Sequence, residues 1–173
     1  MRLFVALLGC ALALNGAGKL SGRRAPGFSL PDMQMRQHDL ADYRGKVVLI
    51  DIMRTNCPEC QKLTPKLETV KAKYPGRVIV LSVVTLPDNQ TTVAKYVAAY
   101  KVTGPVLFDC GQMAASFVKA TPQNPSMSLP HLFFVDTQGV IRNDFSDHEV
   151  SGLTVEALSA EVERLLVPAS KSR

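Results

Sequence analysis

The chain has 173 residues, a length that suits a single domain able to bury a hydrophobic core of its own. Hydrophobic residues make up 46% of the sequence and charged residues 20%, a balance that excludes an intrinsically disordered protein. The formal charge of +5 comes from basic residues scattered among acidic ones without a basic–aromatic motif, so we expect no nucleic-acid partner.

The first 17 residues have the pattern of a secretory signal peptide. Arg2 precedes the apolar run "LFVALLGCALAL", which is as long as a signal-peptide core and too short to span a bilayer. We expect cleavage at about residues 13–18. The letters "LLGC", ending at Cys10, loosely resemble a lipoprotein cleavage box, so a lipid-anchored protein is the alternative. Either route exports the chain, and we expect the periplasm, where thiol–disulfide chemistry is possible.

The remaining sequence predicts a polar linker over 18–25 and one domain over 26–173. Short apolar pieces broken by prolines favour an N-terminal edge hairpin between Pro26 and Leu40. A helical turn, "DLADYRGK", ends at Gly45. Lys46–Met53 then forms a nearly unbroken apolar run with many β-branched residues, which is typical of a strand buried on both faces.

Helical and strand patterns alternate over the rest of the chain. The predicted elements are a helix over 58–74, a strand over 77–86, a helix around 93–100, a strand over 104–109, a helix over 112–118, a loop over 121–129, a hairpin of 131–136 with 140–145, and a helix that begins at the N-cap Thr154 and ends near 165. This order favours an α/β three-layer sandwich, in which helices flank a central mixed β-sheet.

Without the leader the chain keeps Cys57, Cys60 and Cys110, too few for a disulfide framework or a four-cysteine metal site. The first two fall where a strand gives way to a helix. Cys57 suits the N-cap and Pro58 the first helical position, and Cys60 lies one turn later within disulfide reach. The helix N-terminus favours a thiolate on Cys57, and Cys60 is placed to resolve a mixed disulfide. We therefore expect a redox-active disulfide and no other cofactor or metal.

The segment "LIDIMRTNCPECQKLTP" resembles the active site of thioredoxin-fold proteins. Together with "APGFSLPD" and "DLADYRGKVVLID", it is similar to exported redoxins of the TlpA/ResA type, relatives of AhpC/TSA proteins, over roughly residues 25–166. The resemblance implies a buried Asp51 that exchanges a proton with Cys60. It also implies a cis Pro130 that presents the backbone of Leu129 to a substrate peptide. The residues alone leave open a solvent-facing carboxylate and a trans proline.

We expect the substrate to bind next to Leu129 and Pro130 and to contact Asn56, Pro58 and Glu59. The family usually carries tryptophan where this chain has Asn56, so its substrate preference does not transfer. Glu59 opposes a second negative charge on the first cysteine, which favours a reductant over an oxidant. Arg54 either stabilises the thiolate or is solvated. His131 is expected to be a surface or packing residue rather than a ligand.

We compare three functions with these residues. The leading one is an exported thiol-disulfide oxidoreductase that reduces protein disulfides. For this function the resemblance implies substrates such as apocytochrome c or copper-site proteins and a membrane thiol electron donor. A thiol peroxidase would require proline at position 50 and threonine at position 54, where this chain has Ile50 and Arg54. A copper-binding chaperone would use Cys57, Cys60 and His131 as ligands. Cys110 is expected to be a buried or loop residue rather than a third redox thiol.

Overall fold

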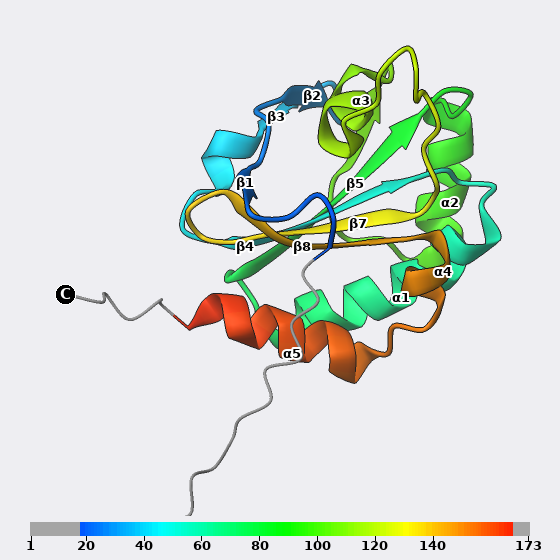
Figure 1. Cartoon of the computed structure of the whole chain (residues 1–173). Helices are drawn as coiled ribbons and strands as arrows, with labels where there is room; N and C mark the ends of the chain where they lie inside the picture. The colour runs from blue at the N-terminus through cyan, green and yellow to red at the C-terminus, as the bar shows by residue number, and fades with distance from the viewer. Residues whose placement is uncertain (1–17, 168–173) are drawn as a thin grey trace, which may run out of the picture.

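The computed structural model describes residues 18–167 (Figure 1). The predicted signal peptide over 1–17, with the alternative lipid-anchor residue Cys10, lies outside the described residues. Within the described part, a six-stranded mixed sheet lies between layers of helices, which confirms the predicted α/β three-layer sandwich. None of the helices between residues 18 and 167 is long and apolar enough to cross a membrane.

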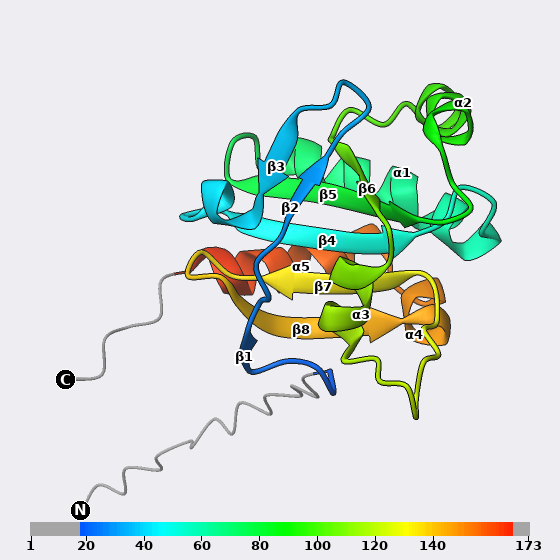
Figure 2. The same ribbon diagram turned by 90° about the horizontal axis from the view of Figure 1, so that it is seen from above.

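The central sheet has the strand order β1-β8-β7-β4-β5-β6 (Figure 2). The strands are β1 (Arg23–Arg24), β4 (Val47–Met53), β5 (Val78–Thr85), β6 (Val106–Asp109), β7 (His131–Val135) and β8 (Val140–Ser146). Strands β4, β5 and β6 are parallel, whereas β7, β8 and β1 each pair antiparallel with their neighbours. All seven residues of β4 are buried, as the apolar run predicted. The carboxyl ends of the three parallel strands therefore share one edge of the sheet.

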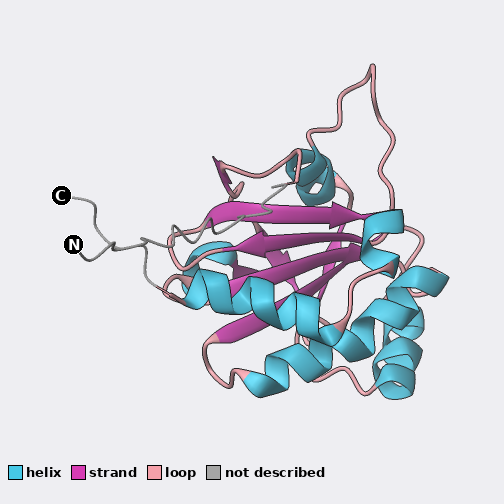
Figure 3. Ribbon diagram, turned by 60° about the horizontal axis from the view of Figure 1, so that its bottom comes forward, coloured by secondary structure: helices cyan, strands magenta, loops and turns pink. Residues whose placement is uncertain are grey.

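Helices cover both faces of this sheet (Figure 3). They are the 3₁₀ turn η1 (Leu40–Tyr43), α1 (Pro58–Lys73), α2 (Gln90–Tyr100), α3 (Gln112–Val118), α4 (Asp147–Ser151) and α5 (Val155–Leu166). On one face, α1 and α5 bury Leu67 and Val162 against Leu49 of β4. On the other face, Phe117 of α3 packs edge-on against Phe133 of β7, with the ring centroids 5.2 Å apart. These two apolar layers hold β4, and the helix that follows it, in place.

The N-terminal part of the domain differs from the predicted linker over 18–25. Arg23–Arg24 forms β1 and pairs with the outer edge of β8, and the Ala25 amide donates to the Gly139 carbonyl at 2.9 Å. A strand of two residues is too short to show an alternating pattern, so this strand could not be predicted from the sequence. The predicted hairpin is confirmed as β2 (Ser29–Pro31) and β3 (Gln37–Asp39), which form a two-stranded sheet of their own.

One helix was missed. Helix α4 has five residues, too few to show a helical period. Its N-terminus nevertheless carries a capping box, in which Ser146 and Glu149 hydrogen-bond reciprocally. The letters "SDHE" contain that Ser-x-x-Glu pattern, so the start of this helix could have been predicted from its capping box.

Candidate active site

Helix α1 begins directly beyond the carboxyl end of β4, and its first turn carries the cysteine pair. Cys57 is the N-cap, and its Sγ accepts a hydrogen bond from the Cys60 amide at 3.2 Å. Pro58 occupies the first helical position, where the missing N–H leaves no donor unpaired. The structure joins Cys57 and Cys60 in a disulfide with their Cα atoms 5.2 Å apart. The predicted geometry of the pair is therefore confirmed.

The two sulfurs differ in access. Cys57 is partly exposed and is flanked by the exposed residues Asn56 and Pro58, whereas Cys60 is fully buried, with an exposed fraction of 0%. A substrate sulfur can therefore reach Cys57 but not Cys60. Cys60 packs in an apolar cluster with Met53, on the inner side of α1. This arrangement matches an attacking thiol and a resolving thiol.

Asp51 lies in the middle of β4 with an exposed fraction of 0%. Strand alternation places it on the side of Val47 and Leu49, the face that α1 covers. Neither carboxylate oxygen has a hydrogen-bond partner. Burial raises the pKa of Asp51 from 3.8 to about 7, because the charged form loses its hydration. The predicted burial is confirmed, and a carboxyl with a pKa near neutrality suits proton exchange.

The loop before β7 approaches the same cluster. The Leu129–Pro130 peptide bond is cis, as the resemblance implied. Leu129 is half-buried and, like Met33 and Cys57, packs against the apolar cluster that holds Cys60. Between residues 18 and 167 nothing hydrogen-bonds to the backbone amide or carbonyl of Leu129. An extended peptide could therefore pair with this backbone next to the disulfide.

Glu59 is the acidic residue between the cysteines, and two neighbours hold it. Lys62 Nζ lies 2.7 Å from its Oε1, and Ser151 Oγ donates to its Oε2 at 2.9 Å. The hydrogen bond from Lys62, followed by that from Ser151, lowers the pKa of Glu59. The carboxylate is therefore ionised at neutral pH and places a negative charge in the first turn of α1. The Ser151 contact also ties α4 to the cysteine-bearing turn.

Two residues that contact this site, Tyr96 and Asp88, were missed from the sequence. The Tyr96 hydroxyl of α2 lies 2.6 Å from Thr64 Oγ1 and donates to the Cys60 carbonyl at 3.3 Å. Burial raises the pKa of Tyr96, so the hydroxyl keeps its proton. Asp88, in the loop after β5, hydrogen-bonds to Thr55 just before the cysteines. Polar residues that follow a parallel strand gather at one sheet edge, a signal that could have pointed to Asp88.

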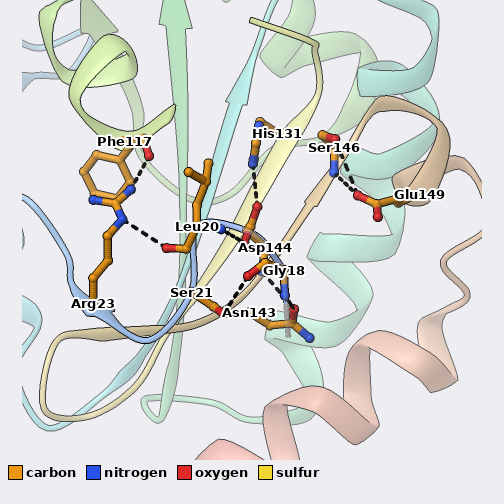
Figure 4. A network of polar contacts seen from close by, with 10 residues as sticks. All are labelled: Gly18, Leu20, Ser21, Arg23, Phe117, His131, Asn143, Asp144, Ser146 and Glu149. Atoms are coloured by element: carbon orange, nitrogen blue, oxygen red, sulfur yellow. Dashed lines mark hydrogen bonds and ion pairs between the residues drawn. The ribbon is translucent and has the colours of Figure 1, made fainter. Parts of the chain in front are cut away.

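The remaining candidates are not bound to the cysteine pair. His131 is buried, stacks on Phe133 with ring centroids 4.4 Å apart, and bonds through Nε2 to Asp144 Oδ2 at 3.1 Å, so it is a packing residue as expected. Figure 4 shows this pair beside the N-terminal segment, where the Leu20 amide donates to Asp144 Oδ1 at 2.9 Å. Cys110 is exposed in a loop, outside any disulfide.

Within residues 18–167, neither the Arg54 side chain nor a metal-binding group contributes to the contacts described above. The Arg54 side chain is exposed and makes no hydrogen bond or ion pair with any residue from 18 to 167, which favours the solvated alternative. In the same part of the chain, no three side chains of histidine, cysteine, aspartate or glutamate form a group that could hold a metal ion.

Comparison with known sequences places these features in context. A sequence model of the AhpC/TSA family matches residues 21–144. The thiol-disulfide oxidoreductase ResA of Geobacillus thermodenitrificans (strain NG80-2) is 26% identical over 121 residues, which are 70% of this chain and 66% of that protein. The thioredoxin-like protein YneN of Bacillus subtilis (strain 168) is 27% identical over 128 residues, 73% of this chain and 71% of that protein. The chain thus spans about two thirds of the length of these curated relatives.

Solved structures show the same fold. The crystal structure of a thiol:disulfide interchange protein of the thioredoxin family from Chlorobium tepidum TLS has a TM-score of 0.73 at 16% identity, covering 84% of this chain and 97% of that one. A secreted disulfide oxidoreductase from Mycobacterium tuberculosis has a TM-score of 0.67 at 20% identity, covering 80% and 96%. The chain therefore has the thioredoxin fold.

Proposed function

Because the chain belongs to the AhpC/TSA family and carries a cysteine pair at the start of α1, we propose that it is a thiol-disulfide oxidoreductase of the ResA type that reduces disulfides in other proteins. The observation that carries this proposal is the unequal access of two sulfurs within bonding distance: Cys57 is open to solvent and Cys60 is enclosed. Such a pair can accept a substrate at one sulfur and release it with the other.

The reaction begins when the Cys57 thiolate attacks one sulfur of a substrate disulfide. A mixed disulfide forms, and the other substrate sulfur leaves as a thiolate. Cys60 passes its proton to the Asp51 carboxylate, and the new thiolate attacks Sγ of Cys57. The second substrate sulfur then leaves as a thiolate, which takes up the proton that Asp51 returns. Two electrons have passed to the substrate, the Cys57–Cys60 disulfide has formed, and a thiol donor must reduce it again.

Charge around the pair favours the reducing direction. The ionised Glu59 lies in the first turn of α1 and opposes a second negative charge on Cys57. A less stable thiolate destabilises the reduced state relative to the disulfide. The pair then gives up its electrons more readily, which is the property of a reductant. The N-cap hydrogen bond from the Cys60 amide acts in the opposite sense, and it keeps enough thiolate for attack.

The test is the reduction of insulin disulfides by the purified protein with dithiothreitol as the electron source. We expect turnover by the unaltered chain and by Cys110→Ser, and none by Cys57→Ser. Failure of the fully reduced chain to reduce insulin would refute the proposal. Consumption of hydrogen peroxide in the same samples would instead support the thiol-peroxidase alternative, which Ile50 and Arg54 disfavour because they replace the proline and threonine of the peroxidatic motif.

We also place this activity outside the cytoplasm, in the periplasm, because the first 17 residues have a signal-peptide pattern and a dithiol reductant acts where disulfides form. Apocytochrome c and copper-site proteins are the proposed substrates, so the role is in cytochrome c or copper-centre assembly, and a membrane thiol protein is the proposed donor. Mass spectrometry of the protein from a periplasmic fraction tests the location. A mature start within residues 13–18 supports cleavage, and a lipidated Cys10 supports the anchored form.

A further inference from the structure

Three residues, Arg54 to Asn56, join the end of β4 to Cys57. This pre-cysteine loop lies at the surface and has little apolar contact to hold it, since Arg54 and Asn56 are exposed and Thr55 is half-buried. Its central residue, Thr55, is nevertheless held by hydrogen bonds to both its backbone amide and its backbone carbonyl. The Thr55 amide donates to Asp88 Oδ2 at 2.9 Å, and the Thr55 carbonyl accepts from Gln61 Nε2 at 2.8 Å.

Asp88 binds this loop through both carboxylate oxygens. The Thr55 hydroxyl donates to Asp88 Oδ1, while the amide donates to Oδ2, so one side chain holds two donors of a single residue. Thr92 Oγ1 of α2 also donates to Oδ1, at 2.8 Å, and the Asp88 amide donates to the Thr85 carbonyl at 3.1 Å. The carboxylate is therefore itself fixed between the end of β5 and the start of α2.

Helix α2 does not depend on Asp88 for its cap. Asn89 is the N-cap, and its Oδ1 accepts from the amides of Thr91 at 2.9 Å and Thr92 at 3.2 Å. Besides the bond from Thr92, the Asp88 carboxylate accepts from Thr55 in the loop that follows the neighbouring strand, where Met53 of β4 pairs with Val84 of β5. The side chain next to a fully formed helix cap is thus used to hold the loop that leads into Cys57.

We propose that Asp88 is a positioning residue for the redox pair: through Thr55 it fixes the pre-cysteine loop and so aligns Cys57 with Cys60 and with an incoming disulfide. This inference rests on the proposed function. Sulfur exchange requires the attacking sulfur to approach along the axis of the bond that it breaks, so a small displacement of Cys57 slows attack and disfavours ring closure. The negative charge of Asp88 also adds to that of Glu59 in opposing the thiolate.

The test measures the equilibrium of the full chain with a glutathione redox buffer, quantified by alkylation and mass spectrometry. We expect Asp88→Ala to lower the equilibrium constant for forming the Cys57–Cys60 disulfide about tenfold, which corresponds to about 30 mV for this two-electron couple. The matched control, Asn89→Ala, removes the adjacent cap without touching Thr55. It should lower the melting temperature and leave the constant within about twofold.

Two further variants separate position from charge. Asp88→Asn removes the charge but keeps an acceptor for the Thr55 amide, so we expect it to lower the pH midpoint of Cys57 alkylation as Asp88→Ala does, with only about a threefold shift of the equilibrium. Thr55→Ala keeps the charge and loses one hydrogen bond, so the midpoint should stay and the equilibrium should shift about threefold. The second variant decides the question if Asp88→Ala does not fold.

Equal shifts in Asp88→Ala and Asn89→Ala, or no shift in Asp88→Ala and Thr55→Ala, would overturn the inference and leave Asp88 as a support for the fold. The glutathione equilibrium is measured without a protein substrate. A chain that fails to reduce insulin but shows the expected shifts would therefore refute the proposed function and leave the positioning role intact.

Discussion

Replacing Asp51 with asparagine removes the one charge that can form inside β4 and keeps the side-chain shape. In the folded protein the carboxyl has a pKa of about 7, against an ordinary value of 3.8. Between pH 3.8 and about pH 7, the carboxyl therefore keeps its proton in the folded state and has lost it in the unfolded state. As the pH rises through that window, the free energy of unfolding falls. About three pKa units at about 1.4 kcal/mol each give a loss of about 4 kcal/mol by pH 8.5.

The Asp51→Asn protein lacks this loss, because its amide is neutral at every pH. We expect the two proteins to differ little at pH 4 and the variant to be more stable by about 4 kcal/mol at pH 8.5. Urea unfolding followed by circular dichroism measures this, with the disulfide intact so that neither cysteine of the pair titrates. The rest of the sequence is identical in the two proteins, so every other group that binds protons cancels in the difference.

The same variant should reduce insulin at least about tenfold more slowly at pH 7, because Cys60 loses its proton acceptor. Curves of unfolding free energy against pH that run parallel for the two proteins would refute the reasoning. In that case Asp51 would not titrate near neutrality, and the proton would leave Cys60 by another route.

Three other changes test separate parts of the site and the core. Cys60→Ser should leave Cys57 able to attack but unable to release the substrate, so a covalent adduct with insulin should accumulate on non-reducing gels and be absent in Cys57→Ser. Glu59→Gln should favour the Cys57 thiolate and lower the equilibrium constant for disulfide formation with glutathione about threefold, and an unchanged or raised constant would contradict the assigned charge effect. Leu158→Ala should lower the free energy of unfolding by about 2–5 kcal/mol, because this 1% exposed side chain packs against α1 and the sheet. A loss below 1 kcal/mol in urea titration would show that the α5 contact is loosely packed.

Local patterns predicted most of the elements that surround the site. The apolar run ending at Met53 became a fully buried strand, the helix over 112–118 has those bounds in the structure, and Thr154 caps α5 by accepting from the Ala157 amide at 3.2 Å. Each of these elements is determined by a pattern among residues close in the sequence: a helical spacing, a helix cap or a run of β-branched residues. The geometry of the cysteine pair could also be predicted from the sequence, because an N-cap residue followed by proline places both cysteines within the first turn of a helix.

Contacts between distant segments were not readable in this way. Strand β1 exists because Arg23–Arg24 meets the outer edge of β8, more than a hundred residues later, and its own letters carry no strand pattern. The bond between Thr55 and Asp88 joins two loops whose closeness follows only from the parallel pairing of β4 with β5. For Asp51 the resemblance implied burial, but a pKa near 7 also requires that no cation or donor reach the carboxylate, which only the packed structure shows.

The short strand β1 has a consequence for self-association. An uncovered outer strand offers a row of free amides and carbonyls to any passing chain, and natural sheets shield such rows to stay monomeric. Here two arginines pair with Val140 and Ile141, the first two residues of β8, and their positive charges repel a second copy. A chain shortened to begin at Pro26 would keep every helix that surrounds the cysteines and would lose its protection against stacking edge to edge.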